Sequence, residues 1–577
     1  MTSPYFLVNF SFLSVFFIRI IVKRNSFLDS EKNDNLVKQA SFLAVAGIVS
    51  RIIGLLYRSP LSEIIGDLGL GYYQSAYAFY TIILLISSYS IPSAISKIIA
   101  GKLALKEYRN AHRLFLGSMG YVIIVGSASS LVLFFGAPLF VEEAAVPVLK
   151  VFAPTVFVYG ILGVIRGYFQ AHRSMSQTSV SQVIEQIVNA AVSVGAAALF
   201  IKLSMGSLEE PADEASQVLR AVRGAQGSAL GTGLGVVAAL VFMAFVYFVN
   251  RKELIERAEN DFSADIVGYI DIFRSITGVV TPFILSTAVY NIFAPINNKI
   301  FVTLYPVWRN VPQVVATSHW GIFSGKAQVI SNIPIAFSSA MAAAMIPQIA
   351  GFMASKDTES ASRRIGLGVK STMVISIPCA VGIFTFASPI MLLLFPNTRP
   401  NIALGSHCLM ALCVSVVLIA LSTLNSSILQ SIGKLNTPII NALIALVLQT
   451  ALLLVLLRFT GLDVFAVAIS YTFYAGVMAV LNQMAVRRAI GYVQEIKRTF
   501  IIPFVCSVLM SLVSYGVYAL MLLAVPNERI AVLPALAVAV PLYFVLLVLF
   551  KGITERELRR LPAGGLIVKI FKTIHLI

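Results

Sequence analysis

The stretch TPIINALIALVLQTALLLVLL, residues 437–457, contains no Asp, Glu, Lys or Arg. Its length matches the roughly 20 apolar residues that an α-helix needs to cross the hydrocarbon core of a bilayer. The whole chain has the same character, because 58% of its 577 residues are hydrophobic and only 12% are charged. Soluble domains typically have about 25% charged residues. The sequence therefore predicts an all-α polytopic membrane protein.

Comparable apolar runs recur along the chain and predict about fourteen transmembrane helices. They lie near 37–57, 73–98, 114–135, 151–170, 180–201, 224–249, 275–297, 327–349, 371–394, 402–424, 437–457, 464–486, 500–524 and 530–550. The loops between them alternate in charge. The basic loops include residues 97–113, 251–257, 356–364 and 487–498, which the positive-inside rule assigns to the cytoplasm. Loops with acidic residues, such as 202–223, are expected outside.

The order of the runs predicts a duplication. An N-lobe at 36–249 (spans 1–6) and a C-lobe at 275–486 (spans 7–12) have similar length and are joined by a charged cytoplasmic linker at 250–274. Each block has six spans, so both enter the membrane from the same side, and the pseudo-twofold axis lies along the membrane normal. Two further spans occupy 487–550.

Both ends of the chain fall outside this repeat. Residues 1–35 are an N-terminal extension, apolar and then polar, whose charges Arg19, Lys23 and Arg24 follow the apolar stretch, unlike those of a signal peptide. A helix on or across the membrane and a mis-assigned start codon both remain open. Residues 551–577 alternate basic and apolar positions and predict an amphipathic cytoplasmic tail.

Several functions are disfavoured by the residues present. The net charge of +17 is spread over loops without interleaved aromatics, which argues against nucleic-acid binding. The cysteines lie in apolar runs and the histidines lack metal-ligand spacing, so we expect no disulfide, metal or cofactor. GIFSGK, residues 321–326, is too short for a phosphate-binding loop and lacks its Ser/Thr. No catalytic residues are identified, and an enzyme is not expected.

Charged residues within the spans are the candidate functional positions, because such charges are costly in lipid. Arg51 and Arg58 lie two turns apart on one face of the first helix and suit the bidentate binding of phosphate. Glu185 lies across a short turn from Arg166, which predicts a structural ion pair. Asn291, Asn298 and Asn332 in the second lobe are candidate hydrogen-bond donors to a sugar head group.

Three motifs resemble the SpoVB-type polysaccharide transporters, relatives of the MurJ lipid II flippases in the multidrug/oligosaccharidyl-lipid/polysaccharide exporter superfamily. They are SRIIGLLYR (50–58) continuing to IGDLGLGYYQ (65–74), RGYFQ (166–170) with SQVIEQIV (181–188), and NIP (332–334) running to IP (346–347).

The resemblance implies a bacterial plasma-membrane flippase for lipid II or a related undecaprenyl-pyrophosphate glycan, with Arg51 and Arg58 lining a central cleft. It also implies alternating access by a monomer that contacts membrane lipids, with an unknown coupling ion. This sequence has no arginine at 81–90, and Asn332 stands where MurJ-type members carry an acid, so the particular glycan stays open. A cation-coupled multidrug exporter of the same superfamily is the alternative, and it would need deep acids, for which Glu185 is the one candidate.

Overall fold

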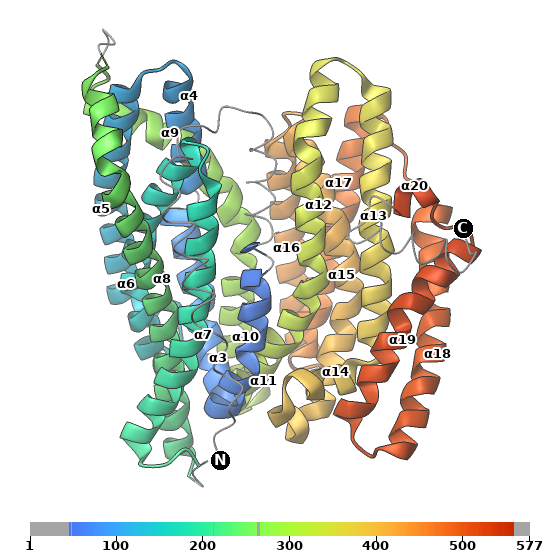
Figure 1. The fold of residues 1–577 in the computed structure, drawn as a ribbon. Helices are drawn as coiled ribbons and strands as arrows, with labels where there is room; N and C mark the ends of the chain where they lie inside the picture. Colours follow the sequence, from blue (N-terminus) through green and yellow to red (C-terminus); the bar gives the residue numbers. More distant parts are fainter. Residues whose placement is uncertain are drawn as a thin grey trace.

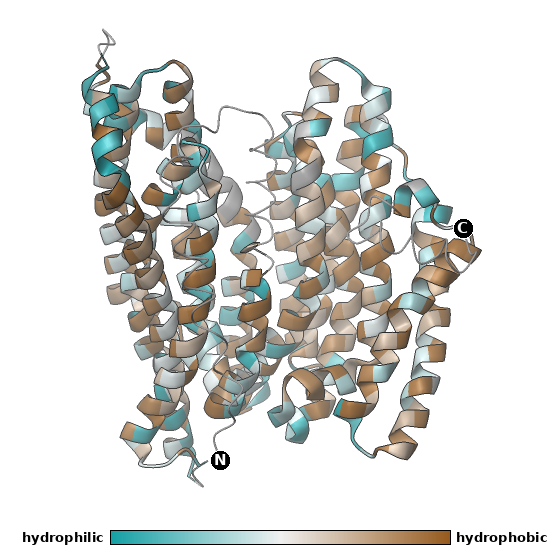
Figure 2. Cartoon of the chain, in the orientation of Figure 1, coloured by the Kyte–Doolittle hydropathy of each residue, from teal (hydrophilic) through white to brown (hydrophobic). Residues whose placement is uncertain are grey.

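A computed structural model describes residues 46–47, 49–89, 91–209, 211, 213–261 and 266–558. The N-terminal extension and most of the predicted tail lie outside these residues. Within them every regular element is a helix, and eleven helices are long and apolar enough to cross a membrane. Apolar residues fill the middle of the long helices, and polar residues gather at their ends (Figure 2). The fold is an all-helical, multi-pass membrane protein.

The N-terminal half forms one group of helices (Figure 1). After helical residues 49–56 come α3 (Arg58–Leu84), η2 (Leu85–Tyr89), α4 (Ile91–Ala104), α5 (Tyr108–Phe140), η3 (Glu143–Ala145), α6 (Val146–Ala171), α7 (Met175–Met205) and α8 (Glu214–Glu259). Their apolar faces form two large clusters, one centred on Phe115 and Phe169 and the other on Tyr80 and Phe152.

The second half forms the other group. It comprises α9 (Tyr269–Asn291), α10 (Phe293–Arg309), α11 (Gln313–Ile322), η4 (Phe323–Ala327), α12 (Gln328–Ala354), α13 (Thr358–Thr385), α14 (Ala387–Leu394), η5 (Pro396–Asn401), α15 (Ile402–Ser431), α16 (Asn436–Phe459) and α17 (Phe465–Ile490). Then η6 (Lys497–Ile501), α18 (Ile502–Ala524), α19 (Glu528–Leu549) and α20 (Glu555–Leu558) follow. The cluster around Val374, Cys506 and Tyr543 packs α18 and α19 against α13.

The predicted spans correspond to helices with several differences in extent. The runs at 37–57, 275–297 and 327–349 are outside the eleven candidate spans, so the count of fourteen remains a prediction. The linker predicted at 250–274 is shorter, because α8 continues to Glu259 and α9 begins at Tyr269. Two ion pairs between residues one turn apart stabilise this charged extension of α8. They are Lys252–Glu256 at 3.9 Å and Glu253–Arg257 at 3.6 Å.

α9 links the two groups. Its residues Ile272 and Ile276 belong to the apolar cluster of the first half, together with Phe115 of α5. A Cβ added at Gly117 of α5 would lie only 2.6 Å from the Ile272 side chain. The chain thus crosses from one half to the other along α9 rather than in the preceding loop.

The two ends of the bundle contain different sets of loops. We name the end with the loops after α4, α6, α12, α15 and α17 the basic end; it is uppermost in Figure 1. At the other end, α3, α10 and α11 bring the two halves together.

Candidate functional site

The helix that carries Arg51 and Arg58 is continuous. The helical hydrogen bonds continue through Tyr57, whose N–H donates to the carbonyl of Ile53 and whose carbonyl accepts from the N–H of Leu61, at 3.2 and 3.1 Å. The two arginines therefore share one helix face, as predicted. Arg51 is exposed and Arg58 is half-buried. Neither forms an ion pair or hydrogen bond with another residue that the structure describes.

Polar and aromatic groups of the first half lie beside this helix. A Cβ at Gly54 would be 3.7 Å from Gln186 Oε1, which places α7 next to it. Tyr73 and Tyr77 stack with ring centroids 5.7 Å apart, and both interact electrostatically with Arg58. The half-buried arginine thus lies next to two stacked tyrosines, of which Tyr73 is buried and its hydroxyl lies 3.3 Å from Thr232 Oγ1.

Arg166 and Glu185 form an ion pair. The Arg166 Nη2–Glu185 Oε2 distance is 2.9 Å, and Arg166 Nε also donates to Ser181 Oγ at 2.9 Å. The arginine is buried, and the pair joins α6 to α7 within one half. Its structural role stays a prediction, but its geometry leaves Glu185 neutralised.

The three predicted asparagines lie in different environments. Asn291 and Asn332 are exposed, whereas Asn298 is buried and donates from Nδ2 to Ser75 Oγ at 2.8 Å. That bond links α10 to α3. In this conformation Asn298 joins the two halves and is not presented to a ligand, and the structure does not bring the three residues into one cluster.

An ion pair that was not predicted lies between the halves. Lys326 of η4 is fully buried and its Nζ contacts Asp67 Oδ1 of α3. Nζ also donates to Thr398 Oγ1 at 2.8 Å and Asn397 Oδ1 at 3.2 Å, and Asn397 Nδ2 donates to the carbonyl of Ser62 at 2.6 Å. We call this set, with the helix contact described next, the lobe junction.

Glycines bring the backbones of α3 and α11 together at the lobe junction. A Cβ at Gly71 would lie 2.1 Å from the Thr317 carbonyl oxygen, and one at Gly321 would lie 2.2 Å from that of Asp67. Gly325, four residues after Gly321, faces Leu70. Small residues at this spacing allow close helix packing in membranes. The GIFSGK motif therefore supplies a packing surface and a buried lysine.

A cavity lies beside the lobe junction. It has a volume of about 370 Å³ and is lined by Tyr72, Glu142, Glu143 and Ala144 from one half and by Gln313 and Val314 from the other. Glu142 is half-buried, and its Oε1 is shielded from solvent without a hydrogen-bond partner among the described residues. Burial raises the pKa of Glu142 to about 7, against opposing effects of the backbone, Ser75 and Lys299.

This raised pKa predicts that acid favours the closed lobe junction. A buried carboxyl holds its proton more tightly than a solvated one, so the contribution is fully present below pH 4.5 and is lost as the pH rises through 7. Allowing for partial exposure, we expect about 1 kcal/mol. The difference in the thermal unfolding temperature of the protein between pH 5 and pH 8 measures this contribution. Glu142→Gln should abolish the difference, whereas the exposed neighbour variant Glu143→Gln should retain it; equal pH responses in both variants would contradict the assignment.

Comparisons with known proteins place this fold among transporters. Solved structures with the same fold include "Lipid II flippase MurJ, inward closed conformation" (TM-score 0.64, 13% identity, covering 88% of this chain and 98% of that one). An inward-facing multidrug resistance MATE family transporter of the MOP superfamily matches with TM-score 0.59 and 18% identity, over 76% of this chain and 94% of that one. The chain therefore has the fold of these MurJ and MATE transporters.

Comparison of the sequence with known families and proteins identifies the family. The polysaccharide biosynthesis protein family matches residues 36–353, and MatE matches 325–455. Lipid II flippase MurJ of Bacillus subtilis (strain 168) is 24% identical over 83% of this chain and 88% of its own length. Stage V sporulation protein B of the same organism is 22% identical over 92% and 98%. The chain belongs to the polysaccharide biosynthesis protein family.

Proposed function

We propose that this transporter is a flippase that moves a lipid-linked oligosaccharide, lipid II or a related undecaprenyl-pyrophosphate glycan, by alternating access. The observation that carries the proposal is the pair of guanidinium groups on one helix face, without protein acceptors among the described residues; Arg58 also interacts with Tyr73 and Tyr77. Guanidinium groups bind phosphate oxygens bidentately, as the pyrophosphate of such a substrate requires. Relatives named as a lipid II flippase and a sporulation protein support this choice.

The proposal includes the orientation of the protein in the membrane and the conformational state of the two halves. We assign the basic end to the cytoplasm by the positive-inside rule, so that the lobe junction lies on the external side. In this assignment the halves are closed to the outside, and Arg51 and Arg58 await a substrate from the inner leaflet. No catalytic step is proposed.

The alternative is a cation-coupled multidrug exporter. The match to a multidrug resistance MATE family structure and to the MatE family supports this alternative. Such an exporter would need a free acid for a cationic drug or coupling ion. Glu185 is the deep acid identified for that role, and it is paired with Arg166 at 2.9 Å. The basic helix face and the neutralised acid together favour an anionic substrate.

Reconstituted vesicles separate the two functions. Purified protein is incorporated with fluorescent lipid II in one set and with an ethidium gradient in another. The flippase proposal predicts that labelled head groups become accessible to a membrane-impermeant reagent in a protein-dependent way, with no ethidium movement. Drug movement without lipid movement would favour the exporter.

Arg51→Ala is expected to slow lipid movement at least tenfold in this assay, because a hydrogen bond to a charged group contributes about 1.5–3 kcal/mol. Arg51→Lys should recover only part of the rate, since lysine lacks the bidentate fork. Arg488→Ala, an exposed arginine at the end of α17, is the control and should be unchanged. A wild-type rate in Arg51→Ala at equal reconstitution would exclude Arg51 from binding.

A further inference from the structure

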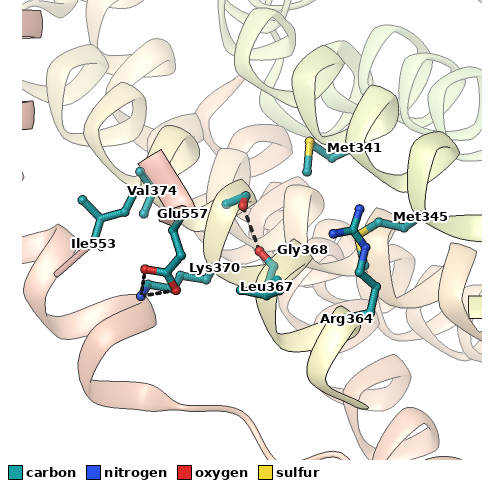
Figure 3. Close-up of a pocket in the computed structure, with 10 residues that line it drawn as sticks. Met341, Met345, Arg364, Leu367, Gly368, Lys370, Val374, Ile553 and Glu557 are labelled. Carbon is teal, nitrogen blue, oxygen red and sulfur yellow. Dashed lines mark hydrogen bonds and ion pairs between the residues drawn. The ribbon is translucent and has the colours of Figure 1, made fainter. Parts of the chain in front are cut away.

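A cavity of about 420 Å³ lies between α12, α13 and the segment around α20, away from both Arg51 and the lobe junction. Part of its wall is apolar, formed by Met341, Met345, Leu367, Val374 and Ile553. Three charged residues complete it. Figure 3 shows Arg364 on one side of Leu367 and Gly368, and Lys370 with Glu557 on the other.

One of the two cations in this cavity is already neutralised. Lys370 Nζ lies 2.9 Å from both carboxylate oxygens of Glu557, and its side chain is only 10% exposed. The backbone N–H and the hydroxyl of Thr554 also donate to Glu557, at 2.8 and 2.9 Å. These bonds hold α20 against α13 and close one wall of the cavity.

The second cation has no such partner. Arg364 Nε is shielded from solvent and has no acceptor among the described residues. Its neighbour Arg363 points elsewhere: it is 71% exposed and pairs with Glu359 at 2.8 Å. A shielded guanidinium N–H without an acceptor is unfavourable unless a ligand or water supplies one. The cavity therefore combines an unneutralised cation with an apolar wall.

The position of the cavity along α13 matches the boundary between lipid head groups and acyl chains. Arg364 lies about 9 Å along the helix axis from Thr358. The apolar run predicted from the sequence begins at Ser371, about two turns beyond. A ligand with a phosphate at the level of Arg364 would place its hydrocarbon against Met341, Met345 and Val374.

We propose that this cavity binds the phosphate of an inner-leaflet lipid, with Arg364 as its hydrogen-bond donor and the methionines of α12 against its acyl chain. The inference relies on the orientation given under the proposed function but not on the transported substrate. Two lipids share this chemistry: a bulk anionic phospholipid and a polyprenyl phosphate. The site is separate from Arg51, so binding there and transport can be measured independently.

Native mass spectrometry of the full chain, released from detergent, tests the proposal. Phosphatidylglycerol, phosphatidylcholine and undecaprenyl phosphate are titrated separately. We expect retention of phosphatidylglycerol over phosphatidylcholine, and at least about a tenfold loss of phosphatidylglycerol affinity in Arg364→Gln. Arg363→Gln is the matched control and should bind as the unaltered chain does. Tighter retention of undecaprenyl phosphate than of phosphatidylglycerol would identify the polyprenyl lipid as the ligand, and the reverse would identify the phospholipid.

Unchanged phosphatidylglycerol binding in Arg364→Gln, an equal loss in Arg363→Gln, or equal retention of phosphatidylcholine would overturn the site. Arg364→Lys, which keeps the charge without the fork, should bind with intermediate affinity and guards against a folding defect in the glutamine variant. Arg51→Ala should lose lipid movement yet keep this binding. Failure of the site and failure of the proposed function are therefore distinguishable.

Discussion

Replacing Lys326 with methionine is expected to open the lobe junction. The lysine is fully buried against Asp67, whose side chain is only 12% exposed, so the variant leaves an uncompensated carboxylate between the halves. Removing one partner of a buried pair typically costs about 3–5 kcal/mol. Asp67 regains water when the halves part, so the closed state should lose about two to four orders of magnitude in relative population.

Distances between spin labels report the change. Leu139→Cys on α5 and Phe459→Cys on α16 are exposed positions, one on each half, at the end of the lobe junction. The distance distribution should shift to longer values in Lys326→Met. Adding Asp67→Asn should restore part of the short distance, because the stranded charge is removed. Lys370→Met, which breaks another buried ion pair far from the lobe junction, should leave the distribution unchanged. An unshifted distribution in Lys326→Met would show that the pair does not hold the halves together.

Gly321→Leu is the second large expected effect. A Cβ at this position would lie 2.2 Å from the Asp67 carbonyl oxygen and 2.6 Å from the Gly71 amide nitrogen, and backbone atoms cannot move aside as a flexible side chain does. The destabilisation of the closed state should exceed the ~1–3 kcal/mol that is usual for overpacking. The same label pair should report separation, and lipid movement should fall with it.

The control is Gly382→Leu on α13, where an added Cβ meets no atom within 4 Å. Both glycines are helical, so both substitutions increase helix propensity by a similar amount. A closed distance distribution in Gly321→Leu would contradict the close approach of α3 and α11.

The all-helical membrane fold could be predicted from the sequence, because lipid requires long apolar runs with internally paired backbones. The extent of the helices could not. α13 begins at Thr358, well before the apolar run at 371–394, since a helix continues through polar residues such as Lys370 when neighbouring elements neutralise them. The partner of Lys370 is Glu557, distant in sequence, and hydropathy contains no information on such pairs.

Distance along the sequence also decides which residues of the candidate site could be predicted. Arg166 and Glu185 lie on helices joined by a short turn, so their pairing could be predicted locally. Lys326 and Asp67 pair across the two halves, and the lysine was first considered only as the end of an incomplete phosphate-binding motif. A signal was present: Gly321 and Gly325 are spaced four residues apart and precede a lysine in the segment 313–327, which contains no other Asp, Glu, Lys or Arg. That combination indicates a packed helix interface with a buried charge.

Gly66 lies in α3 between Arg58, a candidate ligand-binding residue, and Asp67 of the lobe junction. It is the single non-helical residue within α3, with φ +69°, a conformation suited to glycine, and it separates the helical segment that begins at Arg58 from the one that contains Asp67. The arginine and the acid of the lobe junction therefore lie on α3 on either side of a kink, nine residues apart in the sequence. If a ligand at Arg58 changes the equilibrium of the lobe junction by some factor, linkage requires that closing the lobe junction changes the ligand's affinity by the same factor. Variants that weaken the contact between Asp67 and Lys326 should thus alter substrate affinity at a site that they do not touch.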